Sequence, residues 1–223
     1  MLHGIALRSA GRAAEAEPIL LTALDRLTSS FGESGSTTLA CRLSHATNLE
    51  SLDRFAEAAV EIRHVLDIYG ERHGPDHPHT LVCEVNLATA LRFVDEHDEA
   101  MRVIRRVLTD LRLVLGDLHP YTLAASMVLG VLLTDERNLA EAEQVEATAA
   151  ADMARTLGPG HPDTLRCRAN LLLTRQQRGE RGAVAERETV LRQLVAVIGA
   201  DHPNVETLRK ERRLMRALDP QPF

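Results

Sequence analysis

GPDHPHTL, at residues 74–81, decides the fold because the chain contains three more strings of nearly the same kind. The others are GDLHPYTL at 116–123, GPGHPDTL at 158–165 and GADHPNVETL at 199–208. Their His-Pro steps begin at His77, His119, His161 and His202, so the spacing is 42 residues twice and then 41. A fixed period of about 20 to 50 residues indicates stacked copies of one supersecondary unit.

Further columns of like residues emerge when the chain is laid out at a period of 42. They hold leucine, alanine and glutamate: Leu39, Leu81, Leu123 and Leu165; Ala16, Ala58, Ala100 and Ala142; Glu15, Glu57, Glu99 and Glu141. Because one small unit cannot bury its apolar face alone, each unit is expected to pack against its neighbours. The sequence therefore predicts a linear stack of repeats.

Each unit is predicted to consist of two helices. In the third unit, apolar residues within 81–91 follow helical spacing, and a second helical run extends over 100–115. Gly116 suits a helix C-terminus that needs a left-handed backbone. Pro120 suits the first turn of the next helix, where the N–H that proline lacks is not needed. The repeated string is therefore a helix stop joined to a helix start.

The chain is predicted to be all-α, an α-α superhelix of about five helix-turn-helix repeats in one domain over residues 1–218. First helices are expected near 1–9, 37–52, 79–94, 121–135, 163–178 and 204–218, and second helices near 12–29, 54–70, 96–115, 138–157 and 181–198. The repeats divide at 1–35, 36–77, 78–119, 120–161 and 162–202, followed by a capping helix at 203–218 and a disordered tail at 219–223.

Composition argues against some classes of partner. The net charge is -6, whereas binding to nucleic acid phosphates needs a basic surface. The longest uncharged run, residues 121–134, has 14 residues, whereas a membrane-spanning helix needs about 20. The first residues lack the basic segment and apolar core of a secretion signal. We therefore expect a cytoplasmic protein that binds neither nucleic acids nor membranes.

Cysteine and histidine are interpreted as structural residues. Cys41, Cys83 and Cys167 share one repeat column, in which neighbours lie about 10 Å apart, too far for a disulfide. The histidines of residues 73–79 are interpreted as part of a loop and helix start rather than as metal ligands. No phosphate-binding loop, GxSxG, HExxH or strand-linked GxGxxG motif is present. We accordingly expect no enzyme activity, no metal and no cofactor.

The strings HPHTLVCEVNLATALRFVDEHDEAMRVIRRVL, residues 77–108, and HPDTLRCRANLL, residues 161–172, resemble the tetratricopeptide repeat. The resemblance is to its 42-residue form, which is familiar from kinesin light chains and from bacterial proteins in which such repeats follow an NB-ARC-type nucleotide-binding module. It covers residues 2–218, although residues 179–182 have lost the landmarks of the pattern. The resemblance implies a right-handed superhelix whose first helices line a concave groove, and it implies binding of peptides or protein segments rather than catalysis.

Positions i, i+4, i+7 and i+11 share one helix face, and by the resemblance this face of each first helix lines the groove. The candidate groove residues are Ser44, Thr47, Ser51, Val82, Asn86, Thr89, Phe93, Val128, Val131, Asp135, Arg166, Asn170, Leu173 and Gln177. Asn86 and Asn170 are the sharpest candidates, because an amide side chain can both donate to and accept from an extended peptide backbone. Each asparagine equally fits a second interpretation, in which it is solvated or bonded locally.

The two ends of the repeat array differ. The last helix, with Val205, Leu208, Met215 and Leu218 on one side and basic residues elsewhere, is expected to cap the stack. The first helix is short by about one turn, which leaves an N-terminal edge for self-association or an upstream domain.

Two functions follow from these observations. The first is a non-catalytic scaffold that binds a peptide or helical segment in its concave groove. The alternative is a C-terminal sensor or regulatory segment of a signalling NTPase or transcriptional regulator whose catalytic part lies upstream.

Overall fold

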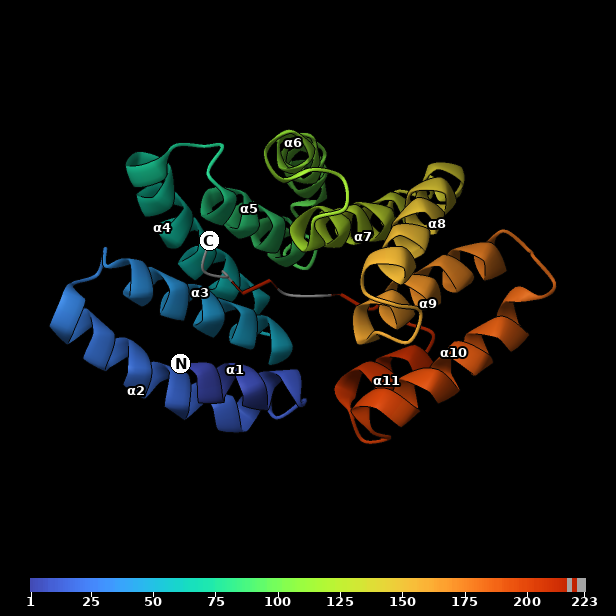
Figure 1. Ribbon diagram of the computed structural model, residues 1–223, viewed down its shortest axis with the longest axis horizontal. Coiled ribbons are helices and arrows are strands. Elements are labelled where there is room, and N and C mark those ends of the chain that lie inside the picture. Colours follow the sequence, from blue (N-terminus) through green and yellow to red (C-terminus); the bar gives the residue numbers. More distant parts are fainter. Residues whose placement is uncertain (216–217, 220–223) are drawn as a thin grey trace. The chain divides into compact units, whose positions relative to one another are not determined.

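The computed structural model describes residues 1–215 and 218–219, and within them every regular element is an α-helix (Figure 1). The helices are α1 (Leu2–Ser9), α2 (Ala13–Phe31), α3 (Ser36–Ser51), α4 (Phe55–His73), α5 (Pro78–Leu91), α6 (His97–Leu115), α7 (Pro120–Asp135), α8 (Leu139–Thr156), α9 (Pro162–Gln177), α10 (Ala183–Ile198) and α11 (Pro203–Arg209). From α1 to α10 the observed boundaries lie within about three residues of the predicted ones. The predicted all-α fold of helix pairs is confirmed.

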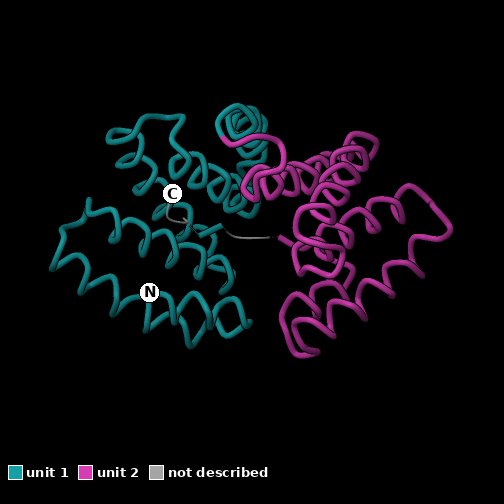
Figure 2. The backbone as a smooth tube through the Cα atoms, in the orientation of Figure 1, with its two compact units in different colours: residues 1–114, 217–223 teal, residues 115–216 magenta. Residues whose placement is uncertain are grey.

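The chain divides into two compact units, residues 1–114 with 217–223, and residues 115–216 (Figure 2). In the first unit α1 packs against α2, α2 against α3, α3 against α4 and α4 against α5, and α3 also contacts α1 and α5. In the second unit α7 to α11 pack in the same consecutive way, and α7 also contacts α9. Within each unit the first helices of successive pairs therefore touch, as stacked repeats require. That the repeats form one domain over 1–218 stays a prediction.

The His-Pro steps form the N-terminal caps of α5, α7, α9 and α11. At each one the imidazole Nδ1 accepts a hydrogen bond from the backbone N–H two residues later, at 3.1–3.2 Å, and proline occupies the first turn. Such a bond satisfies one of the N–H groups that a helix start leaves without an intrahelical partner. The prediction that these histidines belong to helix starts is confirmed.

Left-handed backbone recurs at the turn inside each helix pair. Asp53, Asp95 and Arg137 have φ of 60°, 61° and 64°, and Gly179 has φ of 85°. These four residues are spaced by 42 residues, so Gly179 continues their column. Gly116 has φ of 88° directly after α6, as predicted from its place in the repeated string.

The capping helix is shorter than predicted, because α11 ends at Arg209 instead of continuing to 218. The N–H of Arg212 donates to the carbonyl of Thr207 and the N–H of Glu211 donates to the carbonyl of Leu208. Glu211 has φ of 55°. These bonds and the left-handed residue form a Schellman motif, which terminates helices. Residues 212–215 and 218–219 then have no regular structure, and we call them the tail segment.

Arg187 of α10 stabilises the C-terminal end of α11. Arg187 of α10 donates to the carbonyl of Leu208, at 3.3 Å, and forms an ion pair with Glu211. The arginine therefore satisfies a carbonyl at the C-terminus of α11, where a positive charge is also favourable. Of the tail predicted to be disordered, Asp219 is described and forms an ion pair with Arg8, and residues 220–223 lie outside the described residues.

The core consists of small and aliphatic side chains, which suits close packing of helices. Residues 121–134 of α7 are all buried, as the uncharged run predicted. Cys41, Cys83 and Cys167 are buried free thiols, and burial raises the pKa of each. None of the helices in the described ranges is both long and apolar enough to cross a membrane.

His119→Ala is expected to lower the free energy of unfolding by about 1 kcal/mol, because the Tyr121 N–H loses its acceptor. His119→Asn supplies another capping acceptor and should recover most of that loss. Burial lowers the pKa of His119, so the cap contributes fully above the ordinary histidine pKa and is lost as pH falls through the lowered value. Urea denaturation at several pH values from about 7 to about 5 measures the effect.

The wild type should lose stability relative to His119→Asn across that range, because protonation removes the Nδ1 lone pair. A stability difference that does not change with pH would contradict the capping role of the neutral imidazole.

Candidate functional site

The predicted groove residues divide by burial. Those that are buried are Ser44, Thr47, Val82, Asn86, Thr89, Val128, Val131, Asn170 and Leu173, whereas Ser51, Phe93, Asp135 and Gln177 are exposed or partly exposed and Arg166 is intermediate. The hydroxyl groups of Ser44, Thr47, Ser51 and Thr89 each donate to a carbonyl of their own helix. The hydrogen-bonding capacity of these hydroxyls is therefore used within their own helices. The two asparagines instead bond to the tail segment.

Asn170, on α9 in the second unit, holds the backbone of the tail segment. Its Nδ2 donates to the carbonyl of Leu214 at 2.8 Å, and its Oδ1 accepts from the N–H of Leu214 at 2.8 Å. Asn170 is fully buried and Leu214 is 1% exposed. One amide side chain thus satisfies both polar backbone groups of one non-helical residue.

Asn86, on α5 in the first unit, makes the same pair of bonds. Its Nδ2 donates to the carbonyl of Leu218 at 2.7 Å, and its Oδ1 accepts from the N–H of Leu218 at 2.9 Å. Both asparagines are buried and bonded to residues far away in the sequence, so the interpretation of a solvated or locally bonded asparagine is wrong. We call this paired donation and acceptance the Asn clamp.

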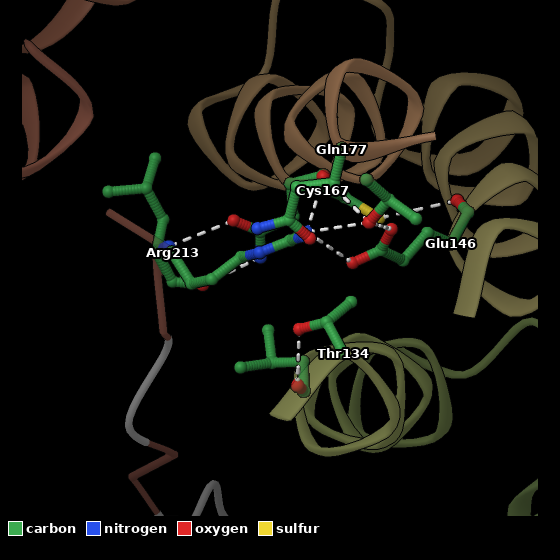
Figure 3. Close-up of polar contacts among 9 residues, drawn as sticks. Thr134, Glu146, Cys167, Gln177 and Arg213 are labelled. Atoms are coloured by element: carbon green, nitrogen blue, oxygen red, sulfur yellow. Dashed lines mark hydrogen bonds and ion pairs between the residues drawn. The ribbon is translucent and has the colours of Figure 1, made fainter. Parts of the chain in front are cut away.

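Arg213 places its guanidinium among polar groups of α8 and α9 (Figure 3). Nη1 donates to Glu146 Oε1 at 3.1 Å, to the Asn170 carbonyl at 2.6 Å and to Thr174 Oγ1 at 2.7 Å. Nη2 donates to Gln177 Oε1 at 3.2 Å. The tail segment is therefore held in the second unit by its backbone, through Asn170, and by a charged side chain.

Glu146 is a carboxylate inside the second unit, with a side chain that is fully buried. Burial raises the pKa of Glu146 to about 7, with Glu143 adding to the shift and Arg213 and Thr174 opposing it. Gly130 of α7 leaves room for it, because a Cβ at that residue would lie 2.5 Å from Glu146 Cγ. A buried carboxylate needs a cation or hydrogen-bond donors, and Arg213 and Thr174 supply them.

A second charged group lies beside the tail segment in the first unit. Arg8 of α1 forms an ion pair with Asp219, and both side chains are largely buried. Burial raises the pKa of Glu50, on α3, to about 8; Arg8 opposes this shift and Asp219 adds to it. Glu50 Oε1 is buried and has no hydrogen-bond partner among the described residues. Glu50 is therefore mostly protonated at neutral pH.

Phe93 and Arg166, two candidates outside the core, have partners away from the Asn clamps. Phe93 stacks on Phe55, with ring centroids 3.9 Å apart. Arg166 forms an ion pair with Asp163 on its own helix. These contacts stabilise the repeats locally, whereas Gln177 accepts a hydrogen bond from Arg213 of the tail segment.

The most informative residue that sequence reasoning missed is Glu146. At a period of 42 it falls in the column of Leu20, Ile62 and Ile104, all of which are fully buried. A carboxylate in an otherwise apolar column was a visible signal of a polar site. Glu50 and Arg8 gave no comparable signal, because they share one column in which Arg92, Thr134 and Gln176 are also polar.

The histidines of residues 73–79 pack against one another. The rings of His73 and His77 stack at 4.5 Å, and the His77 and His79 rings are 5.2 Å apart. Over the part of the chain that the structure describes, no group of three or more His, Cys, Asp or Glu side chains is arranged to hold a metal ion.

The tetratricopeptide repeat pattern matches three successive segments, residues 38–79, 80–121 and 122–163, which together make up more than half of the chain. The chain belongs to the tetratricopeptide repeat family. The resemblance inferred from residues 77–108 is therefore confirmed. No curated protein matches this tetratricopeptide repeat chain.

Solved structures share the fold. The kinesin light chain nearly identical TPR-like repeats from Podosopora anserina are 23% identical, with a TM-score of 0.58, over 91% of this chain and 99% of their own. BtubC (BKLC) from P. vanneervenii is 19% identical, with a TM-score of 0.65, over 97% of this chain and 84% of its own. A Rap protein complexed with Competence and Sporulation Factor is 15% identical, with a TM-score of 0.74, over 94% of this chain and 55% of its own. These likenesses confirm the tetratricopeptide repeat fold.

Glu50→Gln is expected to stabilise the chain at alkaline pH. Because the pKa of Glu50 is raised to about 8 in the folded state and is about 4.3 in an unfolded chain, its stabilising contribution is complete below the unfolded value and is lost as pH rises through 8. The glutamine variant escapes this loss, so its free energy of unfolding should exceed that of the wild type by roughly 4–5 kcal/mol at about pH 9 and by about 1 kcal/mol at about pH 5.

Denaturant unfolding at both pH values measures this, with the exposed Glu33→Gln as the matched control. An advantage of Glu50→Gln that stays the same at both pH values would contradict the burial of an uncharged carboxyl at residue 50.

Proposed function

We propose that the chain is a protein-interaction scaffold whose first helices bind extended protein segments, through Asn86 in the first unit and through Asn170 in the second unit. The observation that carries this proposal is the Asn clamp, in which each asparagine pairs with both backbone groups of a leucine in the tail segment. A clamp of this kind recognises extended backbone whatever the side chains are, because it uses only the N–H and C=O groups that most residues share.

The position of the clamps in the repeat supports the proposal. Asn86 and Asn170 occupy the same column, two repeats apart, and Ser44 and Val128 fill the other positions of that column. Extended segments are commonly bound through main-chain hydrogen bonds that provide affinity and side-chain pockets that provide specificity. Leu214 and Leu218, both 1% exposed, are examples of leucine side chains buried beside these clamps.

The family supports the same class of function. Tetratricopeptide repeats generally serve as interaction scaffolds rather than as catalysts, and the Rap protein was solved with a factor bound. The alternative, a sensor segment of a signalling NTPase or transcriptional regulator, stays a prediction. So do the cytoplasmic location and a contact at the N-terminal edge.

Selection from a random library of displayed 12-residue peptides tests the proposal. The baits are the full chain and full-chain Arg213→Gln/Leu214→Ser, in which the tail segment is weakened. Asn86→Ala and Asn170→Ala in each bait are expected to reduce the binding of selected peptides by about tenfold or more, since each removes a donor and an acceptor.

Asn48→Ala is the matched control, because Asn48 is buried and donates to the carbonyl of Ala13 within the first unit. Circular dichroism checks that every variant is folded. Selected peptides that bind all variants equally would place recognition on another surface and overturn the proposal.

A further inference from the structure

The residues that surround Arg213 and Leu214 in the second unit form a site with two distinct requirements. We call it the Arg-Leu site and define it as Glu146, Asn170, Thr174 and Gln177 with the apolar side chains that surround Leu214. All of these residues belong to the second unit, and Figure 3 shows the polar part of the site.

The first requirement is for arginine. The guanidinium of Arg213 donates to four different acceptors, namely a carboxylate, a backbone carbonyl, a hydroxyl and a side-chain amide. A planar guanidinium presents several donors in a fixed fork, whereas lysine presents one compact ammonium. Because Glu146 is fully buried, an occupant without a cation would remove the charged partner of this carboxylate, and the acid would have to bind a proton instead.

The second requirement is for an apolar side chain directly after the arginine. Leu214 belongs to an apolar cluster with Leu165, Leu172, Val205 and Leu208. Asn170 fixes the backbone of that same residue through the Asn clamp, so the positions of the leucine side chain and of the preceding arginine are set together. The contacts of the site therefore fit Arg-Leu in this order and in the non-helical backbone of the tail segment.

The contacts of the tail segment suit its replacement by a separate peptide. The hydrogen bonds of the Leu214 backbone are made to a side chain of α9 rather than to a neighbouring strand or helix turn. The segment follows Glu211, whose left-handed backbone ends α11. A covalently attached occupant has an effective concentration in the millimolar range, so a separate ligand must compete with it to bind.

We propose that the Arg-Leu site is a binding site for a partner protein segment that presents an extended Arg-Leu dipeptide, and that the chain's own Arg213 and Leu214 are its resident occupant. The inference rests on the proposed function and gives it a ligand class. A partner segment binds by displacing the tail, so the resident dipeptide sets the threshold that a ligand must exceed.

The test uses a fluorescein-labelled peptide, KERRLM, which copies residues 210–215, and fluorescence anisotropy with the full chain. Full-chain Arg213→Gln/Leu214→Ser should bind this peptide at least about tenfold more tightly than the wild type, since its own tail no longer competes. The matched peptide KERQSM should bind neither protein. Equal affinity of both folded proteins for KERRLM would overturn the proposal.

Two further variants in the Arg213→Gln/Leu214→Ser background assign the contacts. Asn170→Ala should weaken KERRLM binding by about tenfold or more, and the buried control Asn48→Ala should leave it unchanged. Glu146→Gln should reduce the preference for KERRLM over KERQLM, because arginine loses its charged partner. An unchanged preference would contradict the role of Glu146 in selecting arginine.

A measurement on the wild type keeps the proposal testable if the tail variant does not fold. In the wild type with methyl-labelled methionine, excess unlabelled KERRLM should shift the Met215 resonance. Met215 follows the dipeptide that the peptide displaces, and it is half-buried when the tail segment occupies the site. A Met215 resonance that does not move at saturating peptide would overturn the exchange. If library peptides bind through Asn86 and Asn170 while KERRLM binds no variant, only the Arg-Leu inference fails, and the proposed function stands.

Discussion

The architecture of the tail segment depends on one interaction, the paired hydrogen bonds between an asparagine amide and the backbone of a leucine. A segment that is buried without helix or sheet must find partners for its N–H and C=O groups, since an unpaired buried group costs about 1–3 kcal/mol. Asn170 and Asn86 supply a donor and an acceptor each. With those groups satisfied, α11 can end at Arg209 and the chain can continue in a non-helical form.

The repeat determines where these asparagines lie. The histidine caps fix the starts of α5, α7, α9 and α11, and left-handed residues mark the turns inside the helix pairs, so residues 42 apart occupy equivalent places on these first helices. Asn86 and Asn170 thus repeat one function at two positions. Near Asn170 the buried Glu146 adds an acidic side chain, and Gly130 leaves room for that side chain. Buried ion pairs contribute little net stability, but they make the site demanding about its occupant.

Much of the fold was predictable from the sequence, because its signals are local. Each copy of the GPDHPHTL string combines a helix stop with a helix start, and the 42-residue period gave the number and order of the pairs up to α10. The two asparagines were identified from helix spacing and amide chemistry. Their occupant was not, because the contacts join residues 44 and 132 positions apart, and no local pattern reports them.

The end of α11 shows how tertiary contacts override local preference. KERRLMRAL, residues 210–218, is composed of good helix formers, which is why a helix to residue 218 was predicted. The Schellman motif at Glu211, the Arg187 contacts and the Asn clamps together favour the non-helical tail instead. The polar role of Glu146 could have been predicted, because it is a carboxylate in a repeat column that is otherwise apolar. The group of Arg8, Glu50 and Asp219 could be found only from the structure.

Residue-resolved amide hydrogen exchange by NMR tests the central claim most directly. In the isolated full chain, the N–H groups of Leu214 and Leu218 should exchange at least about 100-fold more slowly than in an unstructured peptide, because each donates to a buried asparagine. Asn170→Ala should abolish protection at Leu214 and leave Leu218 protected, and Asn86→Ala should do the reverse. Exchange of both amides at unstructured rates in the wild type would show that the asparagines do not hold the tail, and would contradict the central claim.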